Sequence, residues 1–367
     1  MRTLILTCDT GEGHNACARA IKEVYDLEDS VCDITDALEF IQTGVKSVMS
    51  KGHVFLYRYL PELFNFGYSF SEKHPSTFSE NSVFYNILAL GSKKLNQLVT
   101  ERGYDVVICT HPFAAVMLTN AVKRFELKVK TAFVATDYTC CPSVKDSKLN
   151  YYFIPDKGLI NEFVCETIPR NIIVPSGIPV KQAFFSATDK KEAKLKVGVS
   201  PDKKHIVMMS GSMGCGPIEE LVEKIVEKIG VDTHLSVICG TNSRLEKSLN
   251  ASVGDRDNVH IKGFVKDIPL MLDSADIYLT KPGGLSTTEA AVKGIPMLFI
   301  EAVAACESYN LLWYVHKGVA SGGATVDDLA GMCSYLLKNE DQLDMMRESF
   351  ENVNRGNAAR QIFEILS

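Results

Sequence analysis

Short apolar runs alternate with amphipathic stretches along the whole chain. The runs predict strands over residues 3–8, 105–110, 131–136, 151–155, 205–210, 234–239, 259–261, 276–280 and 296–300. Between them lie helical patterns, such as residues 218–229, in which apolar side chains recur on one face. Strands that alternate with helices predict an α/β fold built on parallel sheets.

Both halves of the chain begin in the same way, with a strand, a glycine-rich turn and a helix. The first turn is Asp9-Thr-Gly-Glu-Gly-His14 and the second is Ser210-Gly-Ser-Met-Gly-Cys-Gly216. With 367 residues, the chain is also too long for one ordinary core. We therefore expect two Rossmann-like parallel-sheet domains that face a cleft, at residues 1–178 and 179–345. A C-terminal helix over residues 346–367, within a helical pattern from about residue 340, is expected to pack back on the N-terminal domain.

Composition narrows the class of protein. A net charge of −6 disfavours a nucleic-acid partner, which would require a strong basic surplus. The eleven cysteines form no C-x-x-C pair, and several lie in apolar runs, which predicts reduced thiols and a cytoplasmic location. The N-terminus does not resemble a signal peptide, and no apolar window is long enough to span a bilayer. Any contact with a membrane is expected to be peripheral.

The segment from Lys281 to Pro296, KPGGLSTTEAAVKGIP, carries the strongest chemical signal. Gly283 and Gly284 follow a strand and let the backbone turn close to a ligand. Ser286 is expected to cap the next helix and Gly294 to end it. Because free N–H groups at a helix start attract phosphate, the segment predicts a diphosphate site.

Glu289 has two interpretations. It completes a capping box with Ser286, in which the carboxylate reaches back to the cap N–H. Alternatively, its carboxylate accepts the ribose hydroxyls of a nucleotide.

His14 is a candidate general base at the carboxyl end of the first strand, where α/β proteins bind ligands. Asp137 and His111 end two other predicted strands, so they could support the base, replace it or contact an acceptor. The alternative is that all three only cap helices and turns. The pattern Gly11–Ala16 also fits a dinucleotide turn, G-x-G-x-x-A, followed by Asp33 and Asp36.

Metal chemistry is not expected. The only D-x-D pattern, Asp255-Arg-Asp257, lies in a polar loop, and there is no H-x-x-x-H or paired-cysteine pattern. Residues 53–90 contain ten aromatic side chains with interspersed basic residues, which suggests either helices packed on the sheet or a surface for a lipid acceptor.

An ordered set of motifs resembles the monogalactosyldiacylglycerol synthase and processive diacylglycerol glucosyltransferase family. The set comprises the opening around Gly11–Ile21, Thr136-Asp-Tyr138, Ser176-Gly-Ile-Pro179, Lys281–Ala290 and the pair Glu307 and Asn310. The resemblance runs from about residue 3 to residue 350. It implies the GT-B fold, related to the lipid-II-forming glycosyltransferase of peptidoglycan synthesis. It also implies inverting transfer of a hexose from a UDP-sugar, without a metal or other cofactor.

The family pattern assigns roles to particular residues. It implies His14 and Asp137 as the catalytic pair, either of which could be the base, in an N-terminal domain that takes the acceptor. Acceptor contacts are implied for Gly13, His111 and Tyr138. UDP-sugar contacts in the C-terminal domain are implied for Gly211, Ser212, Met213, Gly214, Phe264, Lys281, Gly283, Gly284, Leu285, Ser286, Glu289, Glu307 and Asn310.

The resemblance predicts a lipid acceptor, 1,2-diacylglycerol above others, at the cytoplasmic face of the membrane. Two departures leave the substrates open. Cys306 replaces a glutamine beside the sugar-reading Glu307, and Cys140-Cys-Pro142 replaces a segment that contains histidine and tryptophan. The rival functions are a transferase with a soluble acceptor, a nucleotide-sugar binder without activity, and a UDP-sugar epimerase of the same fold. The sequence leaves the hexose, processivity and oligomeric state open.

Overall fold

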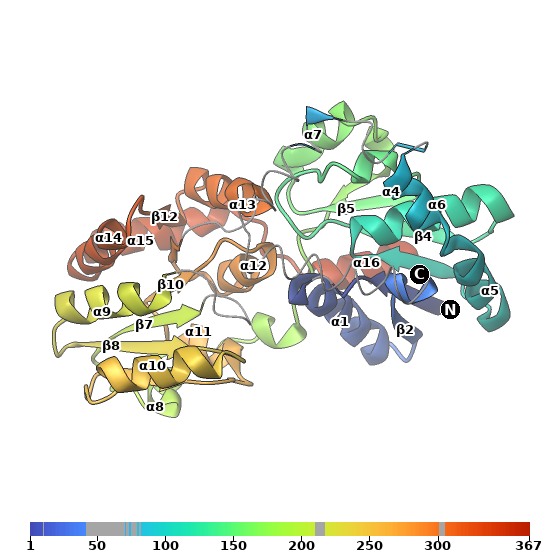
Figure 1. The fold of residues 1–367 in the computed structure, drawn as a ribbon. Helices are drawn as coiled ribbons and strands as arrows, with labels where there is room; N and C mark the ends of the chain where they lie inside the picture. The colour runs from blue at the N-terminus through green and yellow to red at the C-terminus, as the bar shows by residue number, and fades with distance from the viewer. Residues whose placement is uncertain are drawn as a thin grey trace. The chain divides into compact units, whose positions relative to one another are not determined.

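A computed structural model describes residues 1–9, 11–41, 70, 73–74, 79–80, 82–209, 217–300 and 305–367. The chain forms two compact units. One consists of Met1–Gln182, Ala304–Cys306 and Gly356–Ser367, and the other of Ala183–Val303 and Glu307–Arg355. Each unit contains a parallel six-stranded sheet flanked by helices, which confirms the predicted α/β fold (Figure 1).

The sheet of the first unit has the strand order β2-β1-β3-β4-β5-β6. Its strands are β1 (Arg2–Thr7), β2 (Val31–Asp36), β3 (Val106–Cys109), β4 (Lys130–Val134), β5 (Tyr151–Ile154) and β6 (Ile173–Pro175). Its helices are α1 (Glu12–Leu27), α4 (Val83–Ala89), α5 (Ser92–Arg102), α6 (Pro112–Phe125), α7 (Ile160–Cys165) and α16 (Ala358–Leu366).

The sheet of the second unit has the strand order β12-β11-β10-β7-β8-β9. Its strands are β7 (Lys204–Met209), β8 (Thr233–Ile238), β9 (Val259–Lys262), β10 (Ile277–Thr280), β11 (Met297–Phe299) and β12 (Ala320–Gly322). Its helices are α8 (Lys190–Val197), α9 (Ile218–Lys228), α10 (Ser243–Val253), α11 (Ile268–Ser274), α12 (Gly284–Lys293), α13 (Ala305–His316), α14 (Val326–Lys338) and α15 (Glu340–Glu348).

Each sheet reverses its strand order once. The chain leaves β1 toward β2 on one side and returns to β3 on the other, and it leaves β7 toward β8 and returns to β10. Parallel pairing aligns Leu6 with Cys109 in the first sheet and Met209 with Thr280 in the second. In open α/β sheets, ligands bind at the carboxyl ends of the strands at such reversals. His14 and Lys281 follow strands at these two positions.

The strand patterns predicted from sequence are present, with ends shifted by one or two residues. The prediction missed β2, β6 and β12, which carry weak strand signals. β6 and β12 are only three residues long, and β6 ends in a proline while β12 contains Ser321 and Gly322. The helical pattern expected from about residue 340 to 366 is interrupted, because α15 ends at Glu348 and α16 begins at Ala358.

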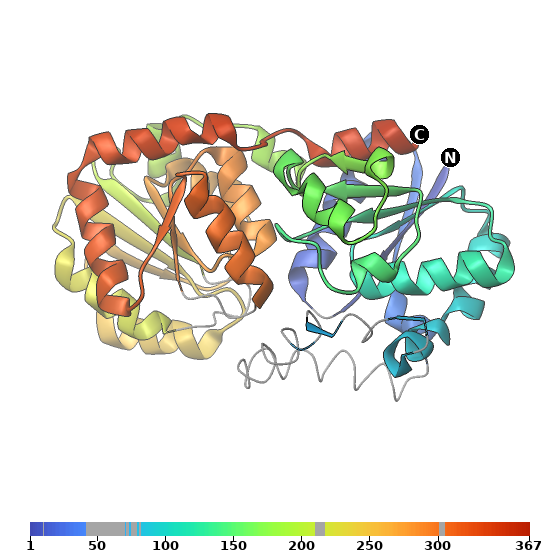
Figure 2. The same cartoon turned by 90° about the horizontal axis from the view of Figure 1, so that it is seen from above.

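Helix α16 packs against α1 in the first unit. Ile362 and Leu366 join the buried cluster that contains Ile21 and Tyr25, and the rings of Tyr25 and Phe363 lie 4.9 Å apart. The two ends of the chain therefore lie side by side in this unit (Figures 1 and 2). Among the described residues, no helix combines the length and the apolar composition needed to cross a bilayer.

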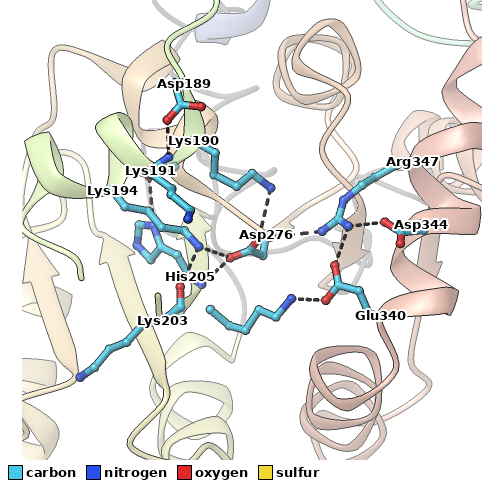
Figure 3. A network of polar contacts seen from close by, with 12 residues as sticks. Asp189, Lys190, Lys191, Lys194, Lys203, His205, Asp276, Glu340, Asp344 and Arg347 are labelled. Carbon is cyan, nitrogen blue, oxygen red and sulfur yellow. Dashed lines mark hydrogen bonds and ion pairs between the residues drawn. The ribbon is translucent and has the colours of Figure 1, made fainter. Parts of the chain in front are cut away.

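The second unit contains a buried carboxylate surrounded by cations (Figure 3). Asp276, which precedes β10, accepts hydrogen bonds from Lys194 Nζ at 2.8 Å, Lys190 Nζ at 3.1 Å and the His205 amide at 2.8 Å. The Arg347 guanidinium lies 3.8 Å away. Burial alone would raise the pKa of Asp276, but the two lysines and the amide outweigh burial and lower it. This cluster ties α8 and α15 to the amino ends of β7 and β10.

Replacing Asp276 with asparagine is expected to destabilise the second unit by about 3–5 kcal/mol, because Lys194 would be left buried without a counter-charge. The free energy of unfolding can be followed in urea through Trp313, the only tryptophan of the chain. Asp344→Asn is the matched control, since this exposed partner of Arg347 should contribute only about 0–1 kcal/mol. Equal unfolding midpoints for the two variants would contradict the assigned role of Asp276.

Candidate active site

His14 lies in the first turn of α1, beyond the carboxyl end of β1. The residue that follows the neighbouring strand β3 holds its side chain in place. The imidazole Nδ1 lies 2.7 Å from the carbonyl oxygen of Thr110, which follows β3. The Thr110 hydroxyl donates in turn to the His14 carbonyl at 3.2 Å. Because a carbonyl oxygen can only accept, Nδ1 carries the ring hydrogen of the neutral imidazole. Nε2 therefore keeps its lone pair, as a general base requires.

Asp137 acts on His14 from the loop after β4. Burial lowers the pKa of His14 below its usual value near 6.5, while the Asp137 charge and the Thr110 carbonyl oppose this change. The net direction is downward, so His14 is neutral at pH 7 and able to accept a proton. Thr136 lies beside both groups, with its hydroxyl 3.1 Å from Nδ1 and 3.4 Å from Asp137 Oδ2.

His111 is buried next to His14, and the two ring centroids are 4.5 Å apart in an edge-to-face arrangement. Its Nδ1 accepts from the Phe113 amide at 3.1 Å and thereby caps α6. The capping role considered for His111 is therefore present, together with its position beside the candidate base. Tyr138 is buried, whereas Gly13 is exposed. A Cβ built at Gly13 would meet no atom within 4 Å among those described, so space is open there.

The segment predicted to bind a diphosphate contains α12, but the helix does not start with the predicted cap. Gly283 is the N-cap residue and no side chain caps the helix. Ser286 lies inside the first turn, where its hydroxyl donates to the Gly283 carbonyl at 3.2 Å. The predicted capping box of Ser286 and Glu289 is therefore wrong, because the helix starts before Ser286. Gly294 does end the helix, with φ of 69°.

The first N–H groups of α12 are consequently not covered by a side-chain cap. Gly283 has φ of −75°, which any residue can adopt. A Cβ at this position would lie 3.6 Å from Ser286 Oγ and 3.8 Å from Glu307 Oε1, which are ordinary contacts. Neither conformation nor packing within the described residues requires a glycine here. Close approach of a ligand to the backbone would require one.

Lys281 and Glu307 form an ion pair of 2.7 Å at the same place, in which the Glu307 side chain is only 6% exposed. Asn310 is completely buried and donates to the Pro282 carbonyl at 2.9 Å, so it fixes the backbone that leads into Gly283. The motifs placed these residues in one site but did not predict the ion pair. No spacing rule in the sequence links positions 281 and 307.

For the other predicted UDP-sugar contacts, the structure gives only their position and exposure. Leu285 and Glu289 are half-buried on α12, and Gly284 is its first residue. Phe264, after β9, is 73% exposed. The predicted phosphate contacts Gly211, Ser212, Met213 and Gly214 lie outside the described residues, as does most of the aromatic stretch 53–90.

The dinucleotide alternative has little support from the two acids on β2. Asp33 accepts from the Tyr104 hydroxyl at 2.5 Å, and Asp36 accepts from the Leu38 amide at 2.9 Å. Both carboxylates thus interact within the protein. In the part of the chain that the structure describes, no cluster of three or more His, Cys, Asp or Glu residues could hold a metal ion.

Comparison with known families finds a match for each half of the chain. Residues 14–180 match the family described as monogalactosyldiacylglycerol (MGDG) synthase, and residues 205–309 match the glycosyltransferase family 28 C-terminal domain. The first half of the chain is therefore similar to MGDG synthase, and the second half is similar to the C-terminal domain of family 28 glycosyltransferases. The resemblance predicted from the motifs is confirmed.

Individual relatives agree with this assignment. The processive diacylglycerol beta-glucosyltransferase of Staphylococcus aureus (strain MRSA252) is 25% identical over 357 residues, which cover 95% of this chain and 88% of the relative. MurG of Acinetobacter baumannii superposes with a TM-score of 0.66 at 12% identity, covering 100% of this chain and 99% of that chain. The UDP co-structure of MnaA from S. aureus gives 0.65 at 14% identity, covering 100% and 98%. These structural matches confirm the GT-B fold, and the chain is a glycosyltransferase of this fold.

Replacing Asp137 with asparagine is expected to lower the pKa of His14 further, because it removes the charge that stabilises the imidazolium. NMR titration of the His14 ring in the free protein measures this change, with His14→Gln to assign the signal. Asp29→Asn, beyond the far end of α1, is the control and should leave the titration unchanged. A rise in the His14 pKa in Asp137→Asn would contradict the geometry described above.

Proposed function

We propose that this enzyme transfers a hexose from a UDP-sugar to a lipid acceptor, 1,2-diacylglycerol above others, at the cytoplasmic face of the membrane. The observation that carries the proposal is the preset tautomer of His14, which leaves Nε2 as a base at the strand reversal of the first sheet. The relatives named for diacylglycerol glycosyltransfer support the substrates.

In the proposed reaction, Nε2 of His14 takes the proton of the acceptor hydroxyl as its oxygen attacks C1 of the sugar. The new O–C1 bond forms on the face opposite the departing diphosphate, so the configuration at C1 inverts. The bond between C1 and the diphosphate oxygen breaks, and its electron pair leaves with UDP. Asp137 stabilises the imidazolium that results.

The second unit would stabilise the leaving group. The uncapped start of α12 offers N–H groups to the diphosphate, and a helix start stabilises negative charge by up to about 2 kcal/mol in partly buried geometry. Lys281 adds a positive charge beside it. Fixed donors of this kind can replace a metal ion, so the proposed reaction uses no cofactor.

An aromatic row supports a lipid acceptor in the first unit. From His14 the row continues to His111 at 4.5 Å, to Phe113 at 4.7 Å and to Phe84 on α4 at 5.5 Å. Phe84 is 37% exposed, and the adjacent Val83 is 77% exposed. A row of aromatic rings that leads from exposed apolar side chains to the base suits an acceptor with a reactive hydroxyl and acyl chains.

UDP release from UDP-glucose or UDP-galactose is expected to depend on vesicles that contain diacylglycerol. His14→Ala should lose about 10²–10⁴-fold in kcat because the base is missing, whereas Asp137→Asn should keep measurable activity. The reverse order would make Asp137 the base. Chelation by EDTA should leave the rate unchanged.

The same assay tests the rival functions. Turnover with water-soluble acceptors alone would favour a soluble substrate, and conversion of the UDP-sugar without acceptor would favour an epimerase. Release of UDP that neither needs an acceptor nor changes in His14→Ala would contradict the proposal. A thermal-shift series with UDP, UDP-sugars and NAD separates the donor from a dinucleotide, since a bound ligand raises the unfolding temperature.

Phe84→Ser is expected to raise the KM for diacylglycerol in vesicles roughly tenfold, because burying an aromatic side chain contributes about 1.5–3 kcal/mol. The KM for the UDP-sugar should not change. Leu195→Ser, an exposed apolar residue on α8, is the matched control. An equal effect of both substitutions on the KM for diacylglycerol would contradict the proposed role of the aromatic row.

A further inference from the structure

The hydroxyl of Thr136 lies within hydrogen-bonding distance of both candidate catalytic residues, His14 and Asp137. It is 3.1 Å from His14 Nδ1 and 3.4 Å from Asp137 Oδ2, and it belongs to the loop directly after β4. The imidazole Nδ1 therefore has two oxygen neighbours, the Thr110 carbonyl and the Thr136 hydroxyl. The sequence pattern singled out Asp137 and gave Thr136 no role of its own.

The hydrogen positions follow from the chemistry of these groups. The Thr110 carbonyl cannot donate, and its 2.7 Å contact requires a hydrogen on Nδ1. Facing that N–H, the Thr136 oxygen can only accept, so the hydroxyl hydrogen is directed away from the ring. The carboxylate oxygen Oδ2 of Asp137 accepts from this hydroxyl at 3.4 Å. The order of donation is thus His14 to Thr136 to Asp137.

This order matters when His14 becomes charged. The titratable side chains that the described residues place against the ring are Asp137, after β4, and His111, at the start of α6. A hydroxyl that donates to a carboxylate is a better acceptor, since linked hydrogen bonds polarise one another. The negative charge of Asp137 can therefore act on Nδ1–H through a directed contact as well as through space.

We infer that Thr136 is a positioning residue that accepts a hydrogen bond from Nδ1–H of His14 and couples the Asp137 carboxylate to the imidazolium formed during transfer. The inference rests on the proposed function for its kinetic consequence, but its structural content concerns the free protein. Proton transfer itself still occurs at Nε2, and Thr136 neither gains nor loses a proton over the reaction.

The test compares Thr136→Val, which removes the hydroxyl at nearly constant shape, with Thr136→Ser, which keeps it. Thr136→Val should lower kcat/KM about tenfold or more, the usual effect of losing one hydrogen bond to a charged group. The acid limb of its pH profile should move to lower pH, because the imidazolium loses stabilisation. Thr136→Ser should restore most of the rate and the wild-type limb.

A double-mutant cycle with Asp137→Asn separates coupling from simple packing. If Thr136 carries the influence of Asp137, the two substitutions together should cost clearly less than the product of their separate effects. Thr119→Val, which removes a buried hydroxyl from α6 in the same unit, is the control and should leave the acid limb in place. Independent, multiplicative effects of Thr136→Val and Asp137→Asn would overturn the inference.

NMR of the ring nitrogens of His14 gives a readout that does not need turnover. In the wild type, the ¹⁵N shifts should show the hydrogen on Nδ1. Thr136→Val should lower the pKa of the ring but leave this hydrogen on Nδ1, because the Thr110 carbonyl still accepts from it. An unchanged titration in Thr136→Val would refute the role of Thr136 even if the enzyme transfers hexose. If no acceptor is glycosylated but the titration changes as expected, the proposed function fails while the role of Thr136 stands.

Discussion

The parallel pairing of β1 with β3 is the constraint on which the candidate catalytic arrangement depends. Its register aligns Leu6 with Cys109, so the residues that follow the two strands emerge side by side. The carbonyl of Thr110 then reaches His14 in the first turn of α1 and sets which nitrogen carries the hydrogen. A shift of one residue in this register would send alternate side chains to the other face of the sheet. The chemistry of the histidine is thus a consequence of how two buried strands pair.

The second unit uses the same topology for a different purpose. Its strand order also reverses, beside β7 and β10, but the residues after β10 present backbone N–H groups and a lysine in place of an imidazole. The opposite ends of these strands carry the Asp276 cluster, which adds fixed charges well inside the unit. In the proposed enzyme, one unit removes a proton and the other accepts the charge of the leaving group. Each proposed task belongs to residues that follow the carboxyl ends of central strands, whereas the strands themselves form the buried core.

The sequence predicted what depends on local pattern and missed what depends on contacts between distant residues. Buried central strands such as β1 and β10 were found because their apolar runs are continuous, whereas β12 has a serine and a glycine and forms only by pairing with β11. Motif order grouped Lys281, Glu307 and Asn310, yet the ion pair and the Asn310–Pro282 bond required the fold. The wrong cap at Ser286 has a similar origin. The local pattern fits a capping box, but the helix begins earlier, with Gly283 as its N-cap residue.

The ion pair between Lys281 and Glu307 also bears on how a donor would be recognised. Both side chains are largely buried, and the ion pair between them compensates part of the cost of burying each charge. A diphosphate at the start of α12 would compete with Glu307 for the lysine. Because Lys281 cannot satisfy both anions fully, Glu307 would then turn its oxygens toward hydroxyl groups, which the sugar of the donor supplies. Binding of the nucleotide and recognition of the sugar would in this way be linked through one lysine. Cys306 immediately precedes Glu307, and its thiol cannot make the hydrogen bonds of the glutamine amide that the family resemblance implies at this position.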